Sequence, residues 1–184
     1  MFRRVIIPMV FILVLGFFLS ISTQIEAEEG LKKTELAPVI DGVIKPGEYS
    51  LSIDLNQIKL FLNRTSESLS LGLIAETEGW VGIGFRSKVM NNAEIILGYV
   101  TEGKGYIYHH LARGRSHTEV KLDYVRASEI RESAGNTVLE VELSAKELIK
   151  SGQKVFPLIV AFGKDDSLTK YHQERRGLEI KLLD

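Results

Sequence analysis

The sequence predicts an all-β protein, an antiparallel β-sandwich or barrel with one short helix. Several segments alternate apolar and polar residues with a period of two, which is typical of strands that bury one face and expose the other. The clearest are residues 58–62, 69–73, 139–143 and 178–182. Many short strands separated by polar turns are typical of sandwiches and barrels.

Two further segments complete the predicted elements. Residues 155–162 are apolar on both faces, which predicts a central strand. Pro157 has no N–H to donate to a sheet, so we expect an edge position or a bulge there. The helix is predicted after Ser144, because Ser144-Ala-Lys-Glu147 has the form of a capping box, and Gly152 ends the turn that follows.

The N-terminal segment resembles a targeting sequence. Arg3 and Arg4 precede an apolar run over residues 5–21, and the small residue Ala27 follows. This is the order of a secretory signal peptide, although the run is also at the short limit of a bilayer span. We expect residues 1–27 to be a cleaved signal peptide and an uncleaved anchor to be the alternative. Residues 28–184 would then form one extracytoplasmic domain, secreted or periplasmic.

Composition excludes several functions. The chain has no Cys, which rules out disulfides, thiolate metal sites and covalent haem attachment through Cys-x-x-Cys-His. A formal net charge of −1 argues against nucleic-acid binding, which needs a basic face. No Ser-His-Asp order and no paired-carboxylate motif stands out. We therefore do not expect a hydrolase.

The segment from Gly79 to Phe85, GWVGIGF, raises the question of what lies against it. Val81, Ile83 and Phe85 share one face of the predicted strand, and Trp80, Gly82 and Gly84 share the other. Glycine weakens a strand, so two on one face indicate either close packing of a neighbour or a flat ligand. The polar turn that follows, residues 86–92, carries Met90, either as a core filler or as a soft metal ligand.

Three segments together resemble a known family. Residues 80–85, Met90 and residues 93–100 (AEIILGYV) resemble the central signature of the DOMON domain. Residues 40–49 (IDGVIKPGEY) are similar to the opening of DOMON domains and of the related family 9 carbohydrate-binding modules. Residues 171–177 (YHQERRG) are similar to the closing element of bacterial members. The resemblance covers roughly residues 38–184.

The resemblance implies an immunoglobulin-like antiparallel β-sandwich and one of two functions. One branch of the family holds a noncovalent b-type haem between a methionine and a histidine and transfers electrons, and another branch is thought to bind sugars. Met90 and His172 stand where the haem branch has its axial ligands. Such a pair favours ferrous iron and raises the reduction potential. The implied partner is a redox protein or a membrane cytochrome.

The resemblance also suggests roles for neighbouring residues. Trp80, Gly82 and Gly84 would form a dry wall beside the porphyrin, and we expect the loops carrying Met90 and His172 to be neighbours. The basic residues next to the proposed ligands are candidates for contacting haem propionates; they are Lys88, Arg175 and Arg176.

Alternatives remain open at the sequence level. His109 and His110 point to opposite faces of one predicted strand and are interpreted as structural, with His110 or His117 as the reserve haem ligand. Tyr106 and Tyr108 share a strand face, which keeps carbohydrate binding as the runner-up function. A third possibility is a ligand-free extracytoplasmic interaction domain.

Overall fold

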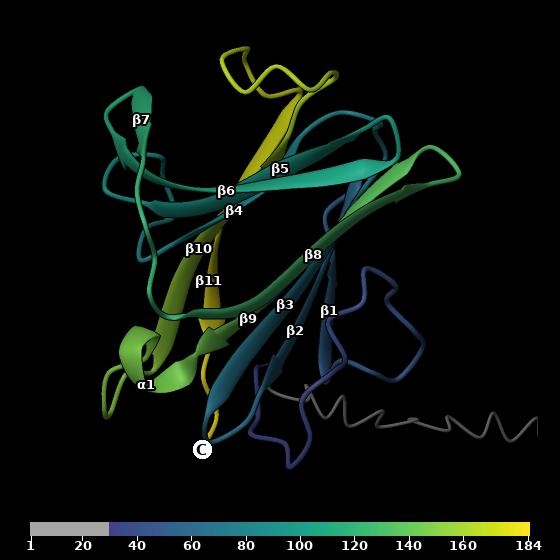
Figure 1. The fold of residues 1–184 in the computed structure, drawn as a ribbon. Helices are drawn as coiled ribbons and strands as arrows, with labels where there is room; N and C mark the ends of the chain where they lie inside the picture. Colours follow the sequence, from purple (N-terminus) through teal and green to yellow (C-terminus); the bar gives the residue numbers. More distant parts are fainter. Residues whose placement is uncertain (1–29) are drawn as a thin grey trace, which may run out of the picture.

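The computed structural model describes residues 30–184, which form two antiparallel sheets packed face to face (Figure 1). The five-stranded sheet has, in spatial order, β1 (Leu51–Asp54), β2 (Ile58–Arg64), β3 (Ser68–Ala75), β9 (Asn136–Ser144) and β8 (Val125–Ser133). The six-stranded sheet has β11 (Glu174–Lys181), β10 (Val155–Phe162), β4 (Val81–Phe85), β5 (Glu94–Thr101), β6 (Lys104–Arg113) and β7 (Ser116–Glu119). The predicted all-β sandwich with one short helix, α1 (Ala145–Leu148), is confirmed.

The core lies between the sheets and follows the period-two pattern of the sequence. Val81, Ile83 and Phe85 of β4 are fully buried in it. They meet the inward side chains of β3 and β9, such as Leu71 and Leu139, which are also fully buried. The core therefore uses one face of β4 and leaves the opposite face, with its glycines, on the outside of the six-stranded sheet.

The structure explains the position of Pro157. β10 lies between β11 and β4, so it is an inner strand, as predicted. Its pairing with β4 begins at Leu158, whereas its pairing with β11 runs through Pro157 opposite Glu179. The proline therefore has a neighbouring strand on one side only, which is the edge-like position that its missing N–H requires.

The helix differs in detail from the prediction. Ser144 is the N-cap residue, but its side chain makes no capping hydrogen bond, so the capping-box interpretation is wrong. The first helical N–H, of Ala145, is instead satisfied by the carbonyl oxygen of Glu67. The proposed signal peptide lies outside the described residues. Within residues 30–184, no helix is long and apolar enough to cross a bilayer.

A cavity on the outer face of the six-stranded sheet as the candidate functional site

The floor of the site is the glycine-bearing face of β4 and the strands beside it. Gly82 pairs with Leu97 of β5 and Ala161 of β10, and Gly84 pairs with Ile95 and Ile159 on the same two strands. All six residues line one cavity of about 610 Å³. Ligand pockets commonly measure about 300–1,000 Å³. The cavity therefore has an apolar floor and a size suited to a small molecule.

The two glycines serve different purposes. A Cβ on Gly84 would lie 2.6 Å from Cγ2 of Ile159, so this glycine is required by the packing of the floor itself. A Cβ on Gly82 would meet only Cβ of Leu97 tightly, at 3.2 Å. Close packing of a neighbour therefore explains Gly84, whereas the flat ligand that the sequence also suggested stays a prediction, with a cavity present on that face.

The loop between β10 and β11 forms one wall and carries His172. It is fastened to the start of β4, because the N–H of Gly163 donates to the carbonyl of Trp80 and the N–H of Trp80 donates to the carbonyl of Asp165. At its other end, the N–H of Gln173 donates to the carbonyl of Phe162 over 2.7 Å. These backbone bonds fix the loop on both sides of His172.

The loop between β4 and β5 forms a second wall and carries Met90. The side chain of Met90 packs on a small apolar cluster of Ala93, Ala112 and Ile159. Backbone contact with β11 holds the loop as well, since a Cβ on Gly177 would overlap the carbonyl oxygen of Lys88. The glycine in the closing sequence element therefore allows the Met90 loop to approach β11.

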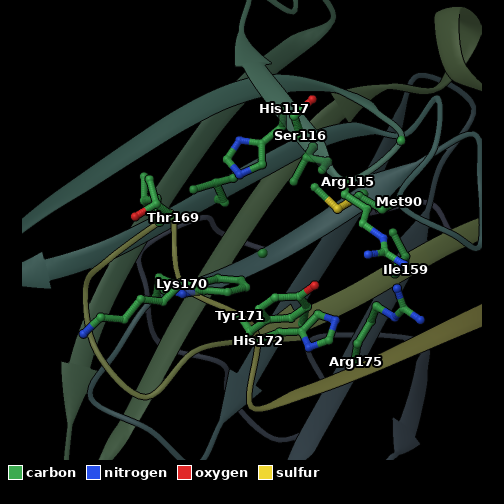
Figure 2. Close-up of a pocket in the computed structure, with 18 residues that line it drawn as sticks. Met90, Arg115, Ser116, His117, Ile159, Thr169, Lys170, Tyr171, His172 and Arg175 are labelled. Carbon is green, nitrogen blue, oxygen red and sulfur yellow. The ribbon is translucent and has the colours of Figure 1, made fainter.

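The structure brings the sequence-predicted site residues together. Met90, His172, Trp80, Gly82 and Gly84 all line the cavity (Figure 2). Neither ring nitrogen of His172 hydrogen-bonds to another group of residues 30–184; its ring only meets that of Tyr171 edge-on. Met90 therefore offers a sulfur and His172 an uncommitted imidazole to the same space.

The reserve histidines are arranged differently. His110 of β6 and His117 of β7 approach one another through their Nδ1 atoms, with ring centroids 4.6 Å apart. His117 lines the cavity. His109 projects to the opposite face of β6, as the strand alternation predicts, because it pairs with the core residue Ile96. His117 thus shares the cavity with His172, but one of its two ring nitrogens is engaged by His110.

Because of the two histidines of β6, the protein is expected to lose stability in acid. Burial, and to a lesser extent the neighbouring His117, lower the pKa of His110, and burial also lowers the pKa of His109. Below pH 6.5 the unfolded chain therefore binds protons that the folded chain resists, so the free energy of unfolding falls as the pH falls. Urea unfolding at about pH 7.5 and about pH 5.5 should show this fall, and it should be smaller in His110→Gln. An equal fall in the free energy of unfolding in wild type and His110→Gln would contradict a contribution of His110 to this pH dependence.

A column of tyrosines continues the outer face beyond the cavity. Tyr99 stacks between Tyr106 and Tyr108, with centroids 5.4 and 6.1 Å away. Lys104 lies over the ring of Tyr106, and His110 meets Tyr108 edge-on. The ring faces of Tyr99 are thus already covered, and the column offers little free aromatic face for stacking a sugar.

The basic residues near the proposed ligands differ in whether they line the cavity. Lys88 pairs with Glu179 and Arg176 with Glu174, and neither lines the cavity. Arg175 does line it. Of the three candidates, only Arg175 therefore lines the cavity. Lys88 is paired with Glu179 instead, and Arg176 lies on the opposite face of β11 from Arg175 because successive strand residues alternate.

The donor set fits an axially ligated porphyrin better than an ion held by protein ligands alone. Within residues 30–184, no three His, Asp or Glu side chains gather to hold a metal ion. The cavity instead presents the sulfur of Met90 and the imidazoles of His172 and His117, the latter in contact with His110, around an apolar, partly side-chain-free floor. Such a floor suits a flat apolar ring, and a sulfur and an imidazole suit an iron that already carries four ring nitrogens.

Comparisons with known proteins agree with this architecture. A family model of the DOMON domain matches residues 54–147. The cytochrome b domain of pyranose dehydrogenase from Coprinopsis cinerea has a TM-score of 0.52 and 11% identity over 67% of this chain and 76% of that chain. The cytochrome domain of Myriococcum thermophilum cellobiose dehydrogenase has a TM-score of 0.51 and 13% identity over 72% of this chain and 81% of that chain. No curated protein matches the chain in sequence.

A family 9 carbohydrate-binding module from Caldicellulosiruptor kristjanssonii, in complex with glucose, has a TM-score of 0.48 and 12% identity over 83% of this chain and 95% of that chain. At such identities the two cytochrome domains establish a shared fold. The family match covers half of the chain and includes Met90, whereas His172 lies beyond it. The sandwich and the matched segment together identify the family: this chain belongs to the DOMON family.

Proposed function

We propose that residues 30–184 form an extracytoplasmic electron-transfer domain that binds a b-type haem noncovalently, with Met90 and His172 as axial ligands. The observation that carries the proposal is that these two side chains, from loops on different strand pairs, line the same cavity. Either residue alone is an ordinary feature of a protein surface or core. Their presence together in one glycine-floored cavity therefore supports a haem held by both.

The cavity supports this ligand in three ways. Ile95, Leu97 and Ile159 offer apolar contact to the flat faces and edges of a porphyrin. Trp80 adds a large aromatic side chain to the same lining. When bound, haem supplies a one-electron couple, and methionine–histidine ligation raises its potential relative to two histidines. Because the two residues would fill both axial positions, the proposed role is electron transfer to a redox partner or a membrane cytochrome.

The export proposal rests on the sequence alone. The order Arg3-Arg4, apolar run and Ala27 supports cleavage by a secretory pathway. N-terminal sequencing of protein from its own host tests it: a start near Glu28 supports export with cleavage, and an intact Met1 in the membrane fraction supports an anchored domain instead.

Carbohydrate binding is the second candidate, and the cavity favours it less. Sugar sites combine open aromatic faces with side chains that hydrogen-bond hydroxyl groups. Here the rings of the tyrosine column stack on one another, and although Trp80 and the exposed Tyr171 line the cavity, its lining contains no Asp, Glu, Asn or Gln. The floor is apolar, which suits a porphyrin better than a hydrated sugar.

A titration separates the two candidates. Protein purified without haem is titrated with haemin and, separately, with glucose and cello-oligosaccharides, while absorbance and heat are recorded. A saturable Soret band at one haem per chain, without heat from the sugars, is the expected result. Saturable sugar binding without a Soret shift would replace the haem proposal with the carbohydrate one.

Replacing Gly177 with alanine is expected to weaken methionine ligation without unfolding the sandwich. The new Cβ would press on the carbonyl of Lys88 and push the Met90 loop away from β11. We expect an unchanged far-ultraviolet circular dichroism spectrum but weaker haem binding. Gly135→Ala is a control for glycine replacement, because a Cβ there meets nothing within 4 Å, although its φ of +77° adds strain of its own. Equal haem affinity in Gly177→Ala and wild type would contradict the positioning role.

A further inference from the structure

The charged side chains that line the cavity are all positive. Arg115, Lys170 and Arg175 line the cavity, and no Asp or Glu does. The whole chain is close to neutral, with a formal net charge of −1. Lys170 is paired with Asp165 over 2.7 Å, outside the lining. Arg115 and Arg175 make no ion pair with any carboxylate of residues 30–184.

The two unpaired arginines belong to the two walls that carry the proposed ligands. Arg115 is in the tight turn between β6 and β7, beside Gly114, whose φ is +65°. The N–H of Gly114 donates to Oδ1 of Asn91 over 2.8 Å, which ties this turn to the residue after Met90. Arg115 is therefore held with the methionine loop.

Arg175 is held with the histidine loop. It is the second residue of β11 and pairs with Ala161 of the cavity floor. Figure 2 shows Arg115 beside Met90 and Arg175 beside His172, with both guanidinium groups on the same side of the cavity. Two cations that lack carboxylate partners and share one side of an apolar pocket form a site for an anion.

We propose that Arg115 and Arg175 bind the two carboxylates of a planar, apolar dianion, with one arginine contributed by each ligand-bearing wall. This inference rests on the proposed haem function, and the two arginines are the groups that would bind the haem propionates. A guanidinium presents several donors in a plane and can bind a carboxylate in a bidentate manner. The pair gives the cavity affinity for a porphyrin dicarboxylate that does not depend on iron.

The test uses a porphyrin without iron, so that axial ligation plays no part. Haem-free protein is titrated with protoporphyrin IX and with its dimethyl ester, and porphyrin fluorescence reports binding. We expect the diacid to bind at least about tenfold more tightly than the ester. A hydrogen bond to a charged group commonly changes an affinity by that factor or more. Arg115→Gln and Arg175→Gln should each weaken diacid binding by about tenfold and leave ester binding unchanged.

Arg113→Gln is the matched control, since Arg113 is exposed in the same hairpin and does not line the cavity. Equal affinity of the wild type for diacid and ester, or failure of the diacid to bind, would overturn the inference. Failure of the haem proposal has a different signature: Met90→Ala and His172→Ala would leave the spectrum of added haemin unchanged, while the preference for diacid over ester could persist.

Discussion

His172→Ala is expected to lose haem. Imidazole is the stronger donor of the proposed pair, and both ring nitrogens of His172 are free of other hydrogen bonds within residues 30–184. Loss of partners that merely orient a ligand already costs about 10–100-fold in metal affinity, so removal of the ligand itself should cost more than about 100-fold. Haem affinity is measured by transfer to apomyoglobin, followed at the Soret band.

Two controls make this result specific. Added imidazole should restore the spectrum of His172→Ala, because the small ring can occupy the space left by the side chain. His117→Ala removes the other histidine of the cavity and should retain haem. If His117→Ala loses haem and His172→Ala keeps it, the ligand is His117, oriented by its contact with His110.

Glu140→Ala is expected to cause a large loss of stability. Glu140 is fully buried on the outer face of the five-stranded sheet. Its Oε2 accepts the N–H groups of Gly42 and Val43 over 2.7 and 3.1 Å, and its Oε1 accepts the hydroxyl of Tyr49 over 2.6 Å. The carboxylate thus fixes the segment before β1 onto the sheet. Its removal leaves one buried and two partly buried donors unsatisfied, at a cost of about 3 kcal/mol in the free energy of unfolding.

Urea unfolding followed by tryptophan fluorescence measures the change. Glu142→Ala is the control: Glu142 lies on the same strand but makes only a partly exposed ion pair with Arg126 at 3.6 Å, worth about 1 kcal/mol or less. Similar losses in the two variants would show that Glu140 does not anchor the segment. Haem binding should survive in both, because neither residue lines the cavity.

Most of the strands predicted from the sequence alternate strictly, and β10 (Val155–Phe162) was predicted instead from a run that is apolar on both faces. β2, β3, β9 and β11 alternate because each has one face in the core. β8 was not predicted: it buries only Ile130 deeply, and a register shift between Val125 and Ala127 interrupts its pattern. β7 was missed because its four residues are polar and it is an edge strand.

The candidate site was predictable where a motif carried it and not where the fold created it. Strand alternation singled out the glycines of β4, the family resemblance singled out Met90 and His172 as ligands, and all four residues line one cavity. Arg115 carries no motif. It lines the cavity from the β6–β7 turn, which is hydrogen-bonded to Asn91, a contact between distant segments that no local pattern encodes. Lys88 looked equivalent to Arg175 in sequence, but Glu179 holds it elsewhere.

The most direct test of the central claim is the near-infrared charge-transfer band that methionine sulfur gives when it binds ferric haem. Haem-loaded wild-type protein should show this band. Met90→Leu, which keeps the apolar packing on Ala93 and Ile159, should lose the band while it retains haem. His117→Gln should keep the band. A wild-type protein that binds haem without the band, or a Met90→Leu variant that still shows it, would contradict ligation by Met90.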